Sequence, residues 1–353
     1  MNKKLLTILL AFSSALLCHA GRHYFVQSLL RPADITFPAD VQNVLVVNNS
    51  AVQAAGTGHT VNGEKARIDT DSASIYCTWG MTEALNETGF FESVTLLDAT
   101  QHRNPQQHAS IVPLTPARID SICRLYGVDA LIVLNNITEK DILSRQLFYP
   151  DEYETSVACH ITLDVLTRSQ WTVCYPQNDI QTPFNSNDSI YWQAEGGGET
   201  QARIRETEKK MPDTRQAIYS AALNAGIRAA LKLTPQWDKE DRYLFDDNKK
   251  NFGTGLQHVI HRQWKEAISA WQPMLNHKKP LTKAYAYANI AVCSEMDNDL
   301  ESALSNAQTA KQLLENINKS EADIAYDIIS YYIEQLTRII EDEPRLKKQL
   351  ATE

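Results

Sequence analysis

The sequence predicts an α/β domain, with a mixed sheet and helices, followed by an all-α domain of helical repeats. Three observations lead to this fold class. Apolar runs rich in β-branched residues alternate with helix-like segments in the first half, strand-like alternation follows them, and a set of small residues recurs in the last third. At 353 residues the chain exceeds the length at which one hydrophobic core stops growing, about 250–300 residues, so two domains are expected.

The first twenty residues have the layout of a secretory signal peptide. Two lysines precede an apolar run, residues 5–17, that is too short to span a bilayer core of about 30 Å. A cut by signal peptidase I after Ala20 would have small residues in the required places, and a lipoprotein-type cut would fall before Cys18 and make it the lipid attachment. Leu17 is a poor residue before a lipid cysteine, so both cuts stay open. We expect an exported protein, either periplasmic or lipid-anchored to the outer membrane.

The α/β domain is expected over residues 21–237. Its strand-and-helix order favours a mostly parallel sheet covered by helices, with a hairpin at one edge. Thr115 as a cap, Pro116 at the first helical position and Gly127 after the last mark the second helix clearly. The predicted elements are a strand at 41–49, a helix at 72–89, a strand at 90–98, a helix at 115–127, a strand at 128–137, and a hairpin of strands at 155–167 and 170–176.

A polar stretch that contains Gly and Pro, residues 177–200, is interpreted as a long loop. It leads into a helix over 213–235, for which Asp213 is the expected N-cap and Pro235 the stop. The charged segment "QWDKEDRYLFDD" that follows is expected to connect the two domains, with the boundary near residue 237.

The order of "VLVVNNS", "TGFFESVTLLD" and "YGVDALIVLNNI" resembles the N-terminal domain of TolB-type translocation proteins and of curli-secretion lipoproteins. The segments "LLRPADITFPADVQNVLVVNNS" and "LTPQWDKEDRYL" resemble an uncharacterised family of Gram-negative envelope lipoproteins with a helical-repeat tail. The resemblance implies an α/β fold and an envelope location. It implies no particular activity, since one fold hosts many functions.

Small residues recur in the helical-repeat domain, expected over residues 238–353. In each set, one small residue is followed by another twelve positions later, and two more members lie four and seven positions after the second residue. The second set follows the first by 36 residues. This spacing resembles the tetratricopeptide repeat; an ordinary antiparallel bundle is the alternative. A long capping helix is expected over 321–344. The residues expected to pack the repeats are Gly255, Ala267, Trp271, Ala291, Ala303, Ala307 and Ala310.

Stacked repeats form a concave groove that can hold an extended peptide or the helix of a partner. Lys283, Tyr285, Tyr287 and Asn289, on the first helix of the second unit, are the residues expected to line this groove.

Charge and cysteine content narrow the function classes. A net charge of −9 without a basic run disfavours nucleic acid as a partner and leaves a lipid anchor as the route to a membrane. Five cysteines remain after processing, an odd number, and Cys77–Cys123 is the first pair to check for a disulfide. No motif predicts a catalytic residue, a metal site or a cofactor.

The leading hypothesis is a non-enzymatic cell-envelope protein that acts as an adaptor, with other envelope proteins or peptides as partners. One alternative is a small-ligand receptor or hydrolase whose site lies under the 177–200 loop and is ringed by Tyr191, Trp192, Glu195 and Glu199. The other is an envelope assembly component that forms oligomers through its α/β domain. The oligomeric state stays open.

Overall fold

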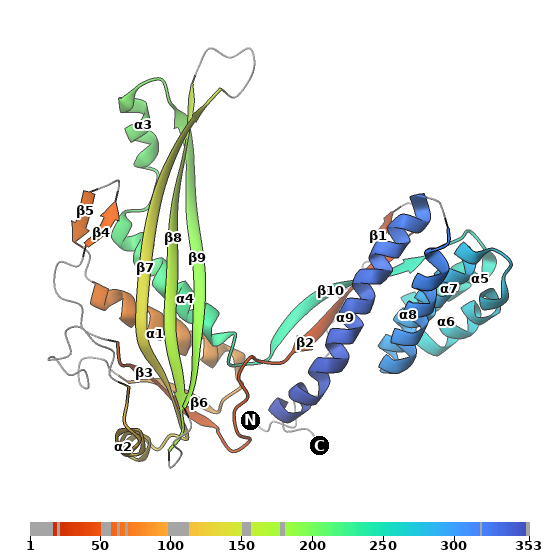
Figure 1. Cartoon of the computed structure of the whole chain (residues 1–353), viewed down its shortest axis with the longest axis horizontal. Coiled ribbons are helices and arrows are strands. Elements are labelled where there is room, and N and C mark those ends of the chain that lie inside the picture. The colour runs from red at the N-terminus through yellow and green to blue at the C-terminus, as the bar shows by residue number, and fades with distance from the viewer. Residues whose placement is uncertain are drawn as a thin grey trace. The chain divides into compact units, whose positions relative to one another are not determined.

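A computed structural model of the chain describes residues 17–19, 22–50, 58–61, 64–67, 70–97, 113–149, 157–176, 181–317 and 320–350 (Figure 1). The signal peptide and both cleavage positions fall outside these residues, apart from the backbone of β1 (Leu17–His19), and so does the side chain of Cys18. The chain forms two compact units. The sheet unit comprises residues 33–234, and the helical unit comprises residues 1–32 together with 235–353.

A five-stranded mixed sheet organises the sheet unit, as the sequence predicts, but the sheet is not mostly parallel. Its strand order is β6-β3-β7-β8-β9, in which β3 runs parallel to β6 and β7 while β7, β8 and β9 are antiparallel. A separate two-stranded ribbon pairs β4 (Gly58–Val61) with β5 (Glu64–Arg67). The strands of the main sheet are β3 (Asn43–Asn48), β6 (Ser93–Leu96), β7 (Ala130–Phe148), β8 (Ala158–Cys174) and β9 (Gln181–Gly197).

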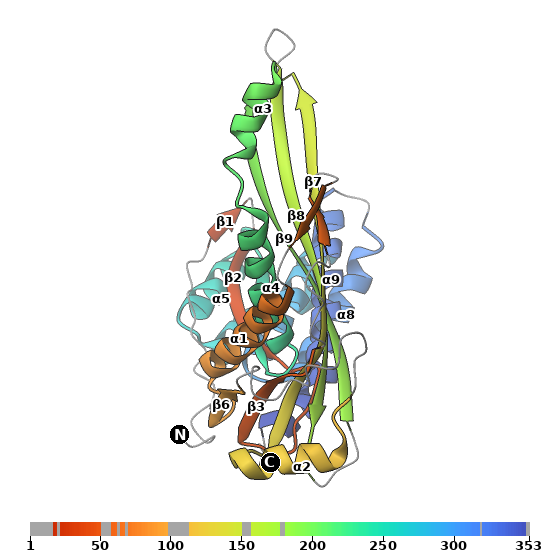
Figure 2. The same ribbon diagram turned by 90° about the vertical axis from the view of Figure 1, so that its left-hand side faces the viewer.

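Helices cover both faces of this sheet. Successive residues of β3 and β7 point to opposite faces, so each strand contributes to two cores. Helices α1 (Thr70–Thr88) and α4 (Thr214–Ala230) lie side by side against one face (Figure 2), and α2 (Pro116–Tyr126) packs against the other. The short helix α3 (Gln201–Glu208) contacts β8 and β9.

Local signals place the helices of this unit correctly. Thr115 accepts a hydrogen bond from the Arg118 N–H at the start of α2, and Gly127 has the left-handed φ of 64° that glycine adopts without strain. Asp213 caps α4 in the same way, through the Gln216 N–H. The predicted helices over 72–89, 115–127 and 213–235 are therefore present.

The predicted hairpin is a single long strand, β8, and most of the predicted loop is a second strand, β9, that pairs with it. β8 continues through the expected turn at Arg168 and Ser169, because β7 and β9 provide hydrogen-bond partners along both of its edges. Residues 181–197, expected to be a loop, form β9, which pairs with β8 over the full length of that strand. Pro183 is tolerated because β9 is an edge strand. The loop prediction is wrong for these residues.

A disulfide between Cys77 and Cys123, the first pair to check, is excluded by the sheet that lies between them. Cys77 is buried in the core under α1 and α4, and Cys123 in the core under α2. The five cysteines whose side chains the structure describes, from Cys77 onward, are free and buried.

A β-ribbon joins the two ends of the chain in the helical unit. β2 (Arg22–Arg31) pairs antiparallel with β10 (Gln236–Phe245) over ten residues, and β1 pairs with the other edge of β2. The predicted connector is therefore a strand, and residues 22–32, expected in the α/β domain, belong with the helices.

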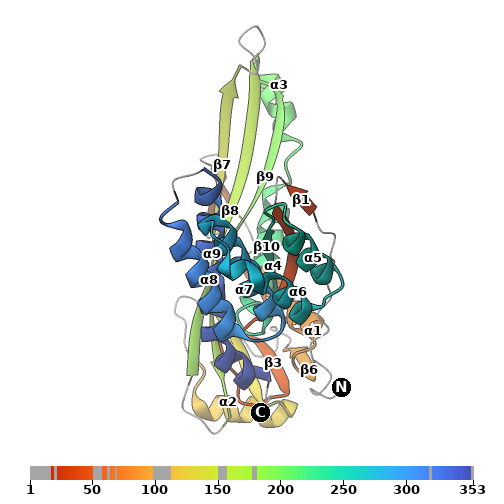
Figure 3. The same ribbon diagram turned by 90° about the vertical axis from the view of Figure 1, so that its right-hand side faces the viewer.

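Successive helices pack against their neighbours in this unit (Figure 3). The last helix extends beyond the predicted end at residue 344, with Pro344 inside it. The helices are α5 (Lys250–Ile260), α6 (Trp264–Trp271), the 3₁₀ helix η2 (Gln272–Asn276), α7 (Pro280–Met296), α8 (Leu300–Leu314) and α9 (Ser320–Leu350).

The backbone repeats with the spacing found in the sequence. Arg262, between α5 and α6, has φ 57°, and Asn298, at the equivalent place between α7 and α8, has φ 65°. The same hydrogen bond closes both turns, from the Gln263 N–H to the His258 carbonyl (2.9 Å) and from the Asp299 N–H to the Ser294 carbonyl (2.8 Å). All seven predicted packing residues are buried. Membership of the tetratricopeptide family stays a prediction.

Candidate functional site

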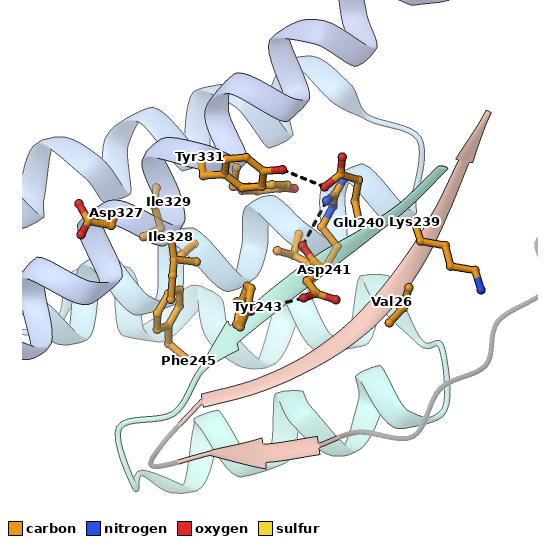
Figure 4. A pocket seen from close by; sticks show the side chains of 14 residues that line it. Val26, Lys239, Glu240, Asp241, Tyr243, Phe245, Asp327, Ile328, Ile329 and Tyr331 are labelled. Carbon is orange, nitrogen blue, oxygen red and sulfur yellow. Dashed lines mark hydrogen bonds between the residues drawn. The ribbon is translucent and has the colours of Figure 1, made fainter. Parts of the chain in front are cut away.

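A cavity of about 620 Å³ lies in the helical unit, between β10 and the helices α7 and α9 (Figure 4). Its volume is within the range of about 300–1,000 Å³ that is typical of ligand sites. One wall is formed by five consecutive residues of β10, 239–243, and by Phe245. The others are formed by Ala288 and Val292 of α7 and, on α9, by Asp327, Ile328, Ile329, Tyr331 and Tyr332; Val26 of β2 completes the lining.

A buried ion pair fixes β10 to the helices beside this cavity. Arg242 donates to both carboxylate oxygens of Glu295, at 2.7 and 2.8 Å, and the side chains are only 1% and 4% exposed. Tyr332 donates a third hydrogen bond to Glu295 at 2.8 Å, and its ring lies 5.2 Å from the Arg242 guanidinium carbon. Burial and the neighbouring Glu295 carboxylate raise the pKa of Tyr332 well above its usual range, so the hydroxyl keeps its proton. The charge of Arg242 is thus balanced internally.

The rim of the cavity is acidic. Glu240, Asp241 and Asp327 line it, while Lys239 points away from α9 in Figure 4. The exposed Tyr331 donates to Glu240 at 3.3 Å, which leaves the face of its ring available. Glu295 neutralises Arg242 and Arg31 pairs with Glu240 at 3.5 Å, so the negative charge at the opening comes from Asp241 and Asp327.

The outer edge of β10 faces this cavity. Among the strands that the structure describes, β10 pairs only with β2, so the hydrogen-bonding groups on its other side are not used by a sheet. At the end of the strand the Asn289 carboxamide fills this edge. It accepts from the Phe245 N–H and donates to the Phe245 carbonyl, both at 2.8 Å.

The predicted groove residues do not line the cavity. Asn289 and Tyr285 are buried, because both face β10, where Tyr285 stacks on Phe245 with 4.8 Å between ring centroids. Tyr287 is half-buried against the helical core, and Lys283 is also half-buried. The prediction that these four residues form an open partner surface is therefore wrong for Tyr285 and Asn289, which instead hold β10 in place.

The residues proposed for a site under residues 177–200 do not converge. Tyr191 and Glu195 lie on one face of β9, and Trp192 points to the other face, against the core. Glu199 lies beyond the strand and pairs with Arg203 at 3.8 Å. Neither this cavity nor the shallow one beside His258 and Glu266 includes any of them.

Sequence reasoning missed the residues that build the cavity. Arg242, Glu295 and Tyr332 come from three separate elements, and no short motif joins them. The segment "KEDR" gives no strand signal, because all four of its residues are charged and the alternation typical of a strand is absent.

The described residues contain neither a metal-binding cluster nor a membrane-spanning helix. No group of three or more His, Cys, Asp or Glu side chains in these ranges is arranged to hold a metal ion. Within the same ranges, no helix has the length and apolar character needed to cross a membrane.

Comparisons with known proteins give family models and distant structures. No curated protein matches the sequence. A domain of unknown function (DUF6340) matches residues 254–338. A neuraminyllactose-binding hemagglutinin homologue from Helicobacter pylori aligns at 11% identity over 56% of this chain and 86% of that chain, with a TM-score of 0.29. The rare lipoprotein B from Shewanella oneidensis aligns at 13% identity over 51% and 89%, with a TM-score of 0.17.

A second family model covers most of the sheet unit and ends at the last residue of β10. It matches residues 41–245, more than half of the chain, and the protein therefore belongs to the family described as a domain of unknown function (DUF8603).

Proposed function

We propose that this protein is a non-enzymatic cell-envelope protein that binds other proteins through the cavity of its helical unit. The observation that carries the proposal is the cavity itself, which combines an unpaired strand edge, an apolar helix face and an acidic rim. Protein-binding sites characteristically combine apolar and aromatic contacts with a polar surround. The partners would be other envelope proteins or peptides.

The polar groups beside the cavity support binding over catalysis. Arg242, Glu295 and Tyr332 satisfy one another's hydrogen-bonding groups, so none of these three is free to act as a nucleophile or proton acceptor. Catalytic groups, in contrast, are arranged so that a reacting atom can reach them. This network is better suited to holding the wall of a binding site.

Position-specific crosslinking tests the proposal. A photo-crosslinking amino acid at Ile328, which lines the cavity, should capture a partner in intact cells, and the same group at Ile324 should not. Ile324 is a suitable control because it is an exposed residue one turn earlier on the same helix and is outside the cavity. The captured protein, once purified, should bind the wild-type chain and lose most of its affinity for an Ile328→Arg variant, while Ile324→Arg retains it. Capture at both positions alike, or at neither, would remove the support for this function.

The envelope location rests on the signal-peptide layout and is tested separately. The intact mass of protein purified from envelopes distinguishes a chain that begins at an acylated Cys18 from one that begins at Gly21. An uncut chain that still carries residues 1–17 would contradict export.

A further inference from the structure

Resting on this proposed function, we propose that the ligand is an extended peptide that adds to the edge of β10 as a further strand, with a basic residue opposite Asp241 and an apolar residue on each side of it. Strand addition is an established mode of peptide recognition, in which the main chain provides affinity and alternate side chains provide specificity.

Three contacts show which backbone groups of β10 point away from β2. Asn289 bonds to the Phe245 N–H and carbonyl. The Asp241 carbonyl accepts from Arg242 Nη1 at 3.3 Å, and the Lys239 N–H donates to the Asp238 carboxylate at 2.9 Å. All three residues are odd-numbered, as an antiparallel ladder without a bulge requires, since alternate residues bond to opposite sides. The N–H and carbonyl of Tyr243 therefore point outward as well.

The middle of this edge is open. No hydrogen bond between described residues engages the backbone N–H or carbonyl of Tyr243, or the backbone N–H of Asp241. At Phe245, the next outward-pointing residue of β10, Asn289 makes the same pair of hydrogen bonds that a neighbouring strand would make. A peptide would continue this pattern from Tyr243 to Lys239, over a length of about 13 Å at the usual rise of a strand.

The lining of the cavity matches an extended chain better than a helix. Consecutive residues 239–243 line it, and because Arg242 is buried on one face of the strand, a peptide would reach β10 along its outer edge. A docked helix would require a broad apolar groove, and here one wall carries Glu240, Asp241 and Lys239.

The side chains define the peptide sequence. A residue opposite Asp241 would point to the same face as Asp241, where a lysine or arginine forms a favourable cross-strand pair. Its two neighbours would point to the other face, toward Val292, Ile328 and Tyr331, where apolar side chains are favoured. The acidic rim adds long-range attraction for a basic peptide.

Synthetic peptides test the pairing directly. The probe is a fluorescent peptide of sequence TVTVKVTVT, titrated into the purified full-length protein by anisotropy up to about 1 mM. Methylation of the lysine N–H, which would face β10, should weaken binding at least tenfold. Methylation of the following valine N–H, which would face away, should change it by less than twofold.

A charge exchange tests the register. Asp241→Lys should weaken the lysine peptide about tenfold and bind a peptide with glutamate at that position better than the wild type does. Asp241 is exposed, and a thermal melt identifies any loss of folding in the variant.

Three results would overturn strand addition. They are equal binding of the two methylated peptides, no rescue by charge exchange, and no binding by any peptide. If Ile328 still captures a partner in those cases, the proposed binding function stands without this mode. If a peptide binds as expected but Ile328 captures nothing, the envelope function fails and the strand site remains.

Discussion

Arg242 and Glu295 are charged residues that the fold buries almost completely, and this fixes the consequence of removing either one. Glu295→Gln keeps the size of the side chain but leaves the Arg242 charge without a counter-ion. We expect it to lower the free energy of unfolding by about 3–5 kcal/mol, measured by urea denaturation. Glu343→Gln is the control, because its partner Lys347 is largely exposed, and it should cost less than about 0.5 kcal/mol. A cost below 1 kcal/mol for Glu295→Gln would show that the pair does not anchor β10.

Glu139 on β7 makes the stability of the sheet unit depend on pH. Burial, with a smaller contribution from Asp141, raises the pKa of this carboxyl from 4.5 to about 8. Between these values the folded protein holds a proton that the unfolded chain has released, so the free energy of unfolding falls as the pH rises from 4.5 to about 8.

Glu139→Gln should remove this dependence and stabilise the protein at pH 8 relative to the wild type. Denaturation at pH 5, 6.5 and 8 measures the slope, and Glu87→Gln, at an exposed position of α1, should leave it unchanged. An identical pH profile for the wild type and Glu139→Gln would contradict the raised pKa.

At the scale of elements, close helix packing reverses the usual effect of replacing glycine by alanine. An added methyl group at Gly255 would lie 2.2 Å from the Trp271 ring, whereas the one at Gly253 would have no atom within 4 Å. Gly255→Ala should therefore destabilise the protein by about 1–3 kcal/mol, and Gly253→Ala on the same helix should stabilise it by up to about 1 kcal/mol. Thermal melts of the two variants measure the difference. Shifts of the same sign would show that the helices do not meet at Gly255.

Elements defined by local signals are predictable from this sequence, and those defined by distant partners are not. The Thr115 cap, Pro116 and Gly127 determine α2 within a segment of thirteen residues. Nothing local identifies β9, whose polar sequence becomes a strand because β8 supplies its hydrogen bonds. β10 is a stronger case, since its partner β2 lies about 200 residues earlier in the chain. Intrinsic strand propensity predicts little where pairing with a distant strand determines the structure.

The same distinction applies to the candidate site. The 36-residue spacing predicts where helices meet through small residues, because each repeat is a local unit. The cavity depends on Arg242, Glu295 and Tyr332, which are brought together only by the folded unit. Sequence alone could therefore predict the buried faces of the helices but could not predict which surface stays open.

At the scale of the whole molecule, the chain has the form of one unit inserted into a turn of another. Arg31 of β2 pairs with Gln236 of β10 at one end of the ribbon. Pro32, which follows Arg31, and Pro235, which precedes Gln236, therefore both lie at that end. The ends of the sheet unit are also close to each other, since the Ile35 N–H donates to the Lys232 carbonyl at 3.0 Å. Insertions of this kind are tolerated where the two ends of the inserted domain are adjacent.

This arrangement predicts that each unit folds without the other. Replacement of residues 32–235 by Asn-Gly, a two-residue turn suited to antiparallel strands, should give a folded helical unit with a cooperative thermal transition. Residues 236–353 alone should not fold stably, because without β2 they lose Phe25 and leave the apolar surface around Leu244 uncovered. Circular dichroism and amide NMR spectra compare the two fragments. Equal folding of both would show that β2 is not required. β10 would then have no fixed partner strand, and the outer edge proposed to bind the peptide would no longer be defined.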